Sequence, residues 1–169
     1  MVCLEYINFE HNETAAELVR AAYDTPPLAF VHSYGCQQNV NDGERIKGVL
    51  VDIGYGLCDK PEDADLILFN TCAVREHAEQ RVFGNVGALV HGKRRNPNQI
   101  ICLCGCMAQE PHVVERLRQS YQHVDLVFGP QVLWRFPEFM RRIYLRRGRV
   151  FETAPAEGAI AEGLSLIHI

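Results

Sequence analysis

The sequence lacks several features that would assign it at once to a functional class. Nowhere in its 169 residues does an apolar run approach the roughly 20 residues of a membrane-spanning helix. There is no Gly-rich phosphate-binding loop and no Ser/His/Asp arrangement typical of a hydrolase. The first residues lack the basic start and apolar run of a secretory signal. We therefore expect a cytoplasmic protein that is not associated with a membrane.

The composition is that of a globular protein with a mildly acidic balance. Hydrophobic residues make up 47% of the chain, charged residues 22%, and the net charge is −4, which excludes a disordered or uniformly basic chain. The charge is uneven, because the stretch 135–149 combines one acidic residue, Glu138, with six arginines: Arg135, Arg141, Arg142, Arg146, Arg147 and Arg149. Such a stretch can bind phosphate, for example of tRNA, or form the solvated face of a helix, which we favour.

Apolar strands alternate with amphipathic helices from residue 28 onward. The apolar spacing predicts strands over 28–34, 55–58, 65–70, 99–103, 124–128 and 150–152, and helices over 41–53, from Cys72 to about 90, over 111–120 and from Pro137. This alternation predicts a doubly wound α/β fold, with a mainly parallel sheet of about five or six strands and helices on both faces. The crossovers should be right-handed.

The chain divides into four segments. The predicted domain covers residues 28–150, and residues 1–27 form an N-terminal extension with helical spacing over 13–23. Residues 151–163 are rich in Ala, Gly, Glu and Pro, a linker composition. The last residues, 164–169, resemble the translation of a sequencing adapter, so we interpret them as an artefactual tail.

Seven cysteines are the most informative feature, because a reducing compartment keeps most cysteines unpaired. Cys36, Cys72 and Cys106 each lie just past the carboxyl end of a predicted strand, and such ends meet at one ligand-binding edge of the sheet. Helix N-termini there lower the pKa of a thiol, and the thiolate is the form that binds metal. Gly35 and Gly105 would let the backbone approach a bulky group. Three thiolates suit a 4Fe–4S cluster with one open iron.

The pattern by itself leaves alternatives open. The three thiols could hold zinc together with a histidine, for which the candidates are His32, His77 and His112. Each cysteine could also be a small buried hydrophobe. A flavodoxin-like domain that binds a nucleotide or flavin has the same predicted fold, although the phosphate loop is missing.

The other four cysteines carry less information. Cys102 and Cys104 alternate with Cys106, so an extended chain would direct all three to one face. We expect Cys102 in the core, whereas the position of Cys104 is ambiguous. Cys3 and Cys58 have no identifiable partner, and we expect only structural roles for them.

Segments around the three cysteines resemble the signatures of the methylthiotransferases, a family of radical S-adenosylmethionine enzymes. The segments are 34–39 (YGCQQN), 70–72 (NTC), 105–109 (GCMAQ) and 127–130 (VFGP). The resemblance implies that Cys36, Cys72 and Cys106 hold an auxiliary 4Fe–4S cluster. Residues 72–84 (CAVREHAEQRVFG) are similar to the branch that modifies isopentenyl-adenosine beside the tRNA anticodon. The branches that act on threonylcarbamoyl-adenosine or on a ribosomal protein remain alternatives.

The resemblance covers only the N-terminal domain of the family. The second cluster of the family uses a C-x3-C-x2-C motif, which this sequence does not contain. We therefore expect the second 4Fe–4S cluster and S-adenosylmethionine in a missing radical domain that follows the linker, and this chain alone should be inactive. The expected partners of the full-length parent are tRNA, a sulfur donor and an electron donor. Asn39 and Asn70 are expected either to hydrogen-bond near the cluster or to stabilise turns.

Overall fold

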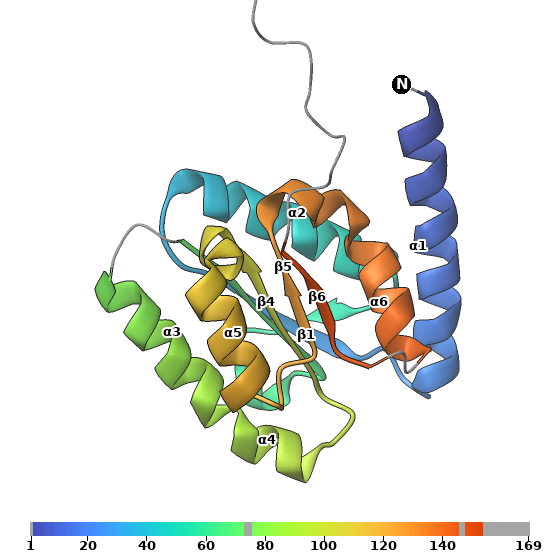
Figure 1. Ribbon diagram of the computed structural model, residues 1–169. Helices are drawn as coiled ribbons and strands as arrows, with labels where there is room; N and C mark the ends of the chain where they lie inside the picture. Colours follow the sequence, from blue (N-terminus) through green and yellow to red (C-terminus); the bar gives the residue numbers. More distant parts are fainter. Residues whose placement is uncertain (1, 73–75, 146–147, 154–169) are drawn as a thin grey trace, which may run out of the picture.

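The structure is a computed structural model that describes residues 2–72, 76–145 and 148–153 (Figure 1). A six-stranded parallel sheet with the order β2-β1-β3-β4-β5-β6 forms its centre. The strands are β1 (Leu28–Ser33), β2 (Gly56–Leu57), β3 (Leu66–Thr71), β4 (Ile100–Gly105), β5 (Leu126–Phe128) and β6 (Val150–Glu152). The predicted α/β fold with a parallel sheet is confirmed.

Helices cover both faces of the sheet (Figure 1). The α-helices are α1 (Val2–Ala22), α2 (Gln37–Asp52), α3 (Glu76–Ala88), α4 (Val90–Arg95), α5 (Pro111–Ser120) and α6 (Phe136–Tyr144), and the 3-10 helices are η1 (Pro61–Asp63), η2 (Cys106–Gln109) and η3 (Pro130–Arg135). One face packs against α1, α2 and α6, and the other packs against α3 and α5. None of the helices in the described residues is both long and apolar enough to cross a membrane.

The central strands explain why the sheet could be recognised in the sequence. Every residue of β3 and β4 is buried, as expected for parallel strands covered on both faces, which appear as continuous apolar runs. On one face, Leu68 and Phe128 pack with Leu50 of α2 and Phe139 of α6. Burying a side chain of this size stabilises the fold by about 1.5–3 kcal/mol. The core is therefore divided by the sheet into two apolar layers.

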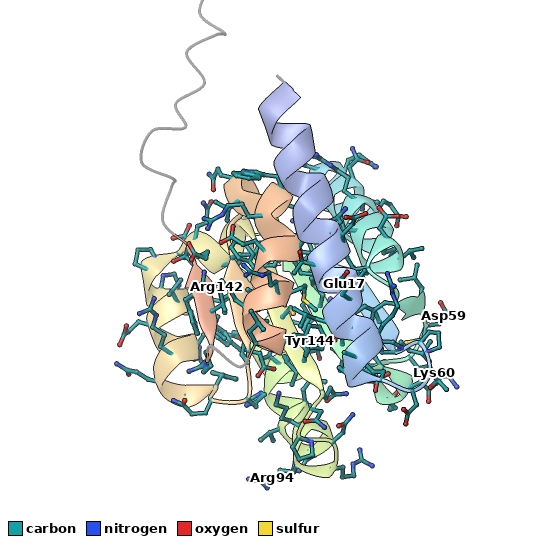
Figure 2. All side chains as sticks on the ribbon, turned by 90° about the vertical axis from the view of Figure 1, so that its right-hand side faces the viewer. Glu17, Asp59, Lys60, Arg94, Arg142 and Tyr144 are labelled. Atoms are coloured by element: carbon teal, nitrogen blue, oxygen red, sulfur yellow. The ribbon has the colours of Figure 1, made fainter. Side chains whose placement is uncertain are left out.

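The N-terminal extension is a full part of this core. Its helix begins at Val2 instead of residue 13, and Ala15, Ala16 and Val19 are at most 6% exposed against the sheet and its helices. The small alanines allow α1 to lie close beside α6, and Figure 2 shows Tyr144 at this junction. The Tyr144 and Tyr55 hydroxyls form a hydrogen bond there, and burial raises the pKa of both phenols well above the usual value.

The helix crossovers do not all have the same hand. In the strand order, the connection from β1 through α2 to β2 steps toward the β2 edge of the sheet, and the connection from β5 through α6 to β6 steps toward the β6 edge. Both helices nevertheless cover the same face. Two crossovers on one face that step in opposite directions have opposite hands. α3 and α5 step in the same direction as α6 but cover the other face, so they share the hand of α2. The prediction of right-handed crossovers throughout is therefore wrong, because the α6 crossover has the opposite hand to the other three.

The C-terminal end of the described chain differs in part from the sequence-based division. The strand predicted over 150–152 is confirmed as β6, in which Phe151 and Glu152 pair with Val127 and Phe128, so these two residues belong to the sheet and not to the linker assigned to 151–163. The rest of the predicted linker from residue 154 onward and the suspected tail, 164–169, lie outside the described residues.

Arg149 satisfies the carboxyl end of α5. Its guanidinium donates hydrogen bonds of 2.7–3.1 Å to the carbonyl oxygens of Leu117, Arg118, Tyr121 and Val124. The last carbonyls of a helix have no partner within the helix, and the positive charge also suits the negative end of the helix dipole. A single side chain directly before β6 therefore stabilises the end of α5, a helix that lies much earlier in the sequence.

Two other arginines of the basic stretch also have partners within the domain. Arg142 lies 2.6 Å and Arg135 lies 3.6 Å from the Glu152 carboxylate, and Arg135 also pairs with Glu138 at 2.8 Å. Arg146 and Arg147 lie outside the described residues. Arg135, Arg142 and Arg149 are therefore each held by a partner within the domain.

Replacing Arg149 by methionine should destabilise the domain. The substitution keeps an apolar stem but leaves the α5 carbonyls without their charged donor, so we expect a loss of about 2 kcal/mol in the free energy of unfolding. This corresponds to a decrease in Tm of about 4–8 °C for a domain of this size, measurable by circular dichroism. Arg94→Met is the matched control, because Arg94 is exposed on α4 and points away from the domain (Figure 2). Equal Tm values for the two variants would contradict the capping role.

Candidate metal centre

The three cysteines singled out in the sequence lie at the carboxyl ends of β1, β3 and β4. Cys36 is the N-cap residue of α2, Cys72 directly follows β3, and Cys106 begins η2. These strands are neighbours in the sheet, and their ends are level, because Ser33 pairs with Asn70 and Thr71 pairs with Gly105. The structure therefore brings the three cysteine-bearing loops together at one edge.

The loops are in direct contact at two glycines. Gly35 and Gly105 have φ angles of +114° and +96°, values that residues other than glycine rarely adopt. A Cβ atom at Gly35 would overlap the Cβ of Cys72, and one at Gly105 would overlap the Thr71 carbonyl oxygen. From the sequence, these glycines were expected to let the backbone approach a bulky group. The structure adds a nearer reason, since neighbouring protein atoms already occupy the space that a side chain would need.

Two buried asparagines, Asn39 and Asn70, connect the first loop with the second, and we call this pair the asparagine clasp. The Asn70 side chain donates a 2.6 Å hydrogen bond to the Asn39 carbonyl oxygen. In return, Asn39 Nδ2 donates to Asn70 Oδ1 at 3.2 Å and to the Thr71 carbonyl at 3.0 Å. Both side chains are at most 3% exposed. The clasp thus fixes the loop that carries Cys36 against the loop that carries Cys72.

The same network reaches a cysteine and the third strand. The Cys36 thiol donates to Asn39 Oδ1 at 3.0 Å, and the Thr71 hydroxyl donates to the Cys104 carbonyl at 2.7 Å. The two asparagines were expected either near the cysteines or in turns, and these contacts place them beside the cysteines. Thr71 was not identified from the sequence. The only signal for it is a buried polar residue at the end of the apolar run of β3.

The thiols of Cys36 and Cys106 differ in their electrostatic surroundings. Hydrogen bonds to the backbone of the first turn of α2, chiefly at Asn39, lower the pKa of Cys36 below the usual thiol value. Burial raises the pKa of Cys106, and the nearby Cys72 and Cys36 sulfurs raise it further. The predicted effect of a helix N-terminus is therefore present at Cys36, whereas burial outweighs it at Cys106. A bound cation would relieve the repulsion among three thiolates.

The zinc alternative requires further ligands beside the cysteines. Among the side chains that the structure describes, no three of His, Cys, Asp or Glu form a group that could hold a single metal ion. His32 packs against the ring of Tyr34 with 4.4 Å between centroids, and His112 bonds to Glu79 at 3.2 Å. The side chain of His77 lies outside the described residues.

The three thiols fit an iron–sulfur cluster by their chemistry. Zinc needs four ligands within about 2.0–2.3 Å of one ion, whereas cluster thiolates bind separate irons and need not converge on one point. Cys36, Cys72 and Cys106 are free thiols, of which Cys36 and Cys106 are exposed and Cys72 is half-exposed. These residues could therefore take up a group at the sheet edge without breaking a disulfide.

The remaining cysteines lie away from this edge. Cys102 and Cys104 are buried in β4 on the face covered by α2 and α6, and burial raises the pKa of both well above the usual value. β4 ends at Gly105 and Cys106 begins η2, so the extended chain on which the prediction of a common face was based includes Cys102 and Cys104 but not Cys106. Cys58 is half-buried and donates to the Lys60 carbonyl at 3.4 Å. The side chain of Cys3 lies outside the described residues.

Comparison with known proteins decides the family. The model of uncharacterized protein family UPF0004 matches residues 29–129, a range that contains all three cysteines. The chain belongs to this family. The UPF0004 chain is also similar to proteins named tRNA-2-methylthio-N(6)-dimethylallyladenosine synthase, with 46% identity over 135 residues in Alkaliphilus oremlandii, 44% over 137 in Clostridioides difficile and 42% over 135 in Halalkalibacterium halodurans. These names confirm the resemblance to methylthiotransferases.

The coverage of these matches is unequal. They include 80–81% of this UPF0004 chain, but the chain spans only 25–29% of the length of these relatives. The similarity therefore concerns one domain of much longer proteins.

Alkylation should show that Cys36 ionises at a lower pH than Cys106. The thiolate is the nucleophile, so the rate of reaction with iodoacetamide rises as each thiol loses its proton. In the metal-free chain, the midpoint of this rise for Cys36 should lie below that for Cys106, as followed by mass spectrometry of the labelled peptides. The reverse order of the two midpoints would contradict the assigned hydrogen bonds at Cys36.

Replacing Asn70 by alanine should destabilise the domain through the asparagine clasp. The change leaves the Asn39 carbonyl and amide buried with fewer partners, which should lower the free energy of unfolding by about 2–3 kcal/mol. Urea unfolding followed by circular dichroism measures this loss. The control is Asn98→Ala, since Asn98 is exposed. If both variants unfold at the same urea concentration, the clasp does not hold the loops together.

Proposed function

We propose that this chain is the N-terminal iron–sulfur domain of a tRNA methylthiotransferase, and that Cys36, Cys72 and Cys106 bind its auxiliary 4Fe–4S cluster. One observation carries the proposal: three free thiols lie at the level ends of adjacent strands. The names of the relatives support the same reading.

The residues of the chain would prepare the site in distinct ways. A cluster held by three protein thiolates keeps one iron open, where a small sulfur species can bind. Cys36, whose pKa is lowered, is poised to be present as the metal-binding thiolate. The asparagine clasp holds the loops of Cys36 and Cys72 at a fixed separation. Exposure of Cys36 and Cys106 leaves the outer side of the site open to a substrate or a further domain.

The activity itself belongs to the longer parent protein. We assign to it the addition of a methylthio group to carbon 2 of isopentenyl-adenosine next to the anticodon, because the relatives carry the name of that product. The second 4Fe–4S cluster and S-adenosylmethionine are assigned to the rest of the parent. The partners would be tRNA, a sulfur donor and an electron donor, in agreement with the expected cytoplasmic location.

Anaerobic reconstitution of the 169-residue chain with iron and sulfide tests the cluster. We expect about four iron and four sulfide per chain, and Cys36→Ala, Cys72→Ala and Cys106→Ala should each lose most of both. Cys58→Ala is the matched control, since Cys58 is a free, half-buried thiol next to η1, and it should keep the full iron content.

Two results would overturn this assignment. Stoichiometric zinc without sulfide in the purified chain would favour a zinc module, and unchanged iron content in the three alanine variants would remove the proposed ligands.

The substrate branch is tested separately, by mass spectrometry of tRNA nucleosides from a strain that lacks the modification and carries the full-length gene. A methylthio group on threonylcarbamoyl-adenosine instead would assign the parent to the other tRNA branch.

A further inference from the structure

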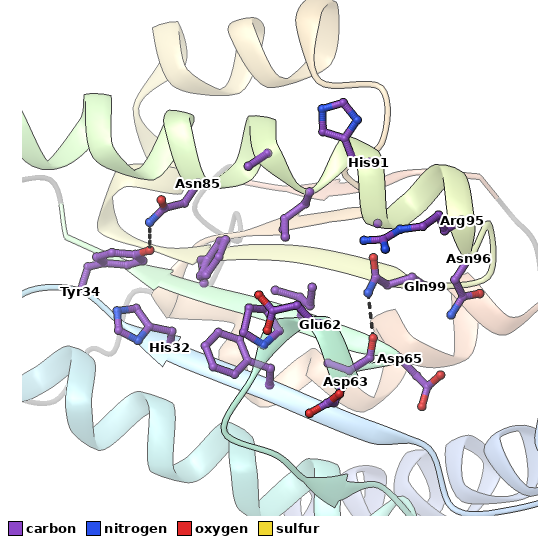
Figure 3. A pocket seen from close by; sticks show the side chains of 18 residues that line it. His32, Tyr34, Glu62, Asp63, Asp65, Asn85, His91, Arg95, Asn96 and Gln99 are labelled. Atoms are coloured by element: carbon purple, nitrogen blue, oxygen red, sulfur yellow. Dashed lines mark hydrogen bonds between the residues drawn. The ribbon is translucent and has the colours of Figure 1, made fainter.

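A pocket of about 740 Å³ lies on the face of the sheet, apart from the cysteine edge (Figure 3). Strands β1 and β3 form its floor, α3 and α4 form one side, and η1 forms the other. Its lining does not include Cys36, Cys72 or Cys106, although all three are described. The volume is in the range of small-molecule sites, about 300–1,000 Å³.

One end of the pocket is aromatic. Phe30 and His32 of β1 and Tyr34 directly after it alternate along an extended chain and therefore project from the same face, and Phe69 of β3 lies beside them. The rings of Phe30 and His32 are parallel within 3°, with 6.2 Å between centroids. His32 is exposed, so its ring can be reached by a planar ligand.

The hydroxyl of Tyr34 is oriented by a neighbour from α3. Asn85 Nδ2 donates to this hydroxyl oxygen at 2.6 Å, as Figure 3 shows. The hydrogen of the hydroxyl therefore remains available for an acceptor on a ligand. The aromatic end can thus both stack a ring and donate to it.

The opposite end contains a buried acceptor without a donor. Gln99 is only 5% exposed, and its Nε2 donates to the Ala64 carbonyl at 2.8 Å. Its Oε1 is buried and accepts no hydrogen bond from any described residue. A Cβ atom at Gly92 would come within 3.1 Å of this oxygen, so the glycine leaves room above it. A buried acceptor without a partner is unfavourable, and an N–H group of a ligand would satisfy it.

The charges around the pocket restrict the ligand further. Three carboxylates line it, those of Glu62, Asp63 and Asp65, against one guanidinium, that of Arg95. Asp65 already accepts the Leu28 N–H at 2.9 Å, whereas Glu62 and Asp63 are exposed. This balance disfavours an anion and favours a ligand that donates N–H and O–H groups.

We propose that this pocket binds an aminopurine nucleoside without a phosphate, with its base stacked on the His32 ring and its N–H and hydroxyl groups toward the Gln99 oxygen and the Glu62 and Asp63 carboxylates. A purine supplies the flat face for stacking, ring acceptors for the Tyr34 hydroxyl and an amino donor. The ribose supplies two further donors for the carboxylates. The site is separate from the cysteines, so the inference does not depend on the proposed cluster.

A fluorescence titration of the metal-free, full 169-residue chain with 2-aminopurine riboside tests the inference. Stacking quenches this probe, so we expect saturable quenching that adenosine reverses. The Kd of AMP should be at least about fivefold higher than that of adenosine, because the carboxylates around the pocket repel its phosphate. His32→Ala and Gln99→Met should each raise the Kd at least about fivefold, the factor for loss of one base–aromatic stack or one polar contact.

Controls separate binding from folding. Trp134→Ala removes an exposed aromatic ring on η3, outside the pocket lining, and should leave the Kd unchanged. Because Gln99 is buried, its variant is compared with the wild type by circular dichroism, whereas the exposed His32 can be changed without a core defect. The proposal is overturned if quenching is absent or does not saturate, or if AMP binds as tightly as adenosine or more tightly. It is also overturned if free arginine, a cation that suits the acidic lining, displaces the probe and adenosine does not.

Discussion

The hydrogen-bonded pair of Asn39 and Asn70 is the contact on which the cysteine edge depends. Each asparagine is buried, and the side chain of each donates a hydrogen bond to an oxygen of the other asparagine, across the gap between the two loops. Parallel strands alone bring their ends to one edge, but they leave the loops beyond free to separate. The clasp, together with the Thr71 hydroxyl on the Cys104 carbonyl, converts three neighbouring strand ends into one rigid rim. A buried amide that lost its partner would cost about 1–3 kcal/mol, so the rim is also a part of the stability of the domain.

Much of the fold could be predicted because the central strands are buried on both faces. The apolar runs of β3 and β4 identify these two strands directly, and Pro111 identifies the first turn of α5. The helix after Cys36 was expected to begin at 41 but begins at Gln37. Its first turn is supported by side-chain contacts such as Gln38 to Asp42 at 3.0 Å, which an apolar pattern does not reveal.

Other features depend on contacts between distant parts of the chain. Helix α6 lies on the same face of the sheet as α1 and packs against both the sheet and α1, and no local sequence pattern specifies that face. The single long helix expected after β3 is divided into α3 and α4 around Leu89, in a segment that contains the weak helix formers Gly84, Gly87 and Gly92. For the site, the positions of the three cysteines followed from the strand–helix alternation. The clasp did not, because it needs the register of β1 against β3.

The packing of α1 against α6 has a consequence for synthesis of the protein on the ribosome. Helix α1 is synthesised well before α6, the helix against which it packs. Until α6 is made, the buried side of α1 around Ala16 and Val19 can pack only against elements such as α2 and the turn at Gly54, and the part that contacts α6 stays uncovered. Contacts between residues so far apart in sequence slow folding and leave apolar surface exposed during synthesis. The apolar layer that contains α1 and α6 is therefore completed only after both helices have been synthesised and have docked together.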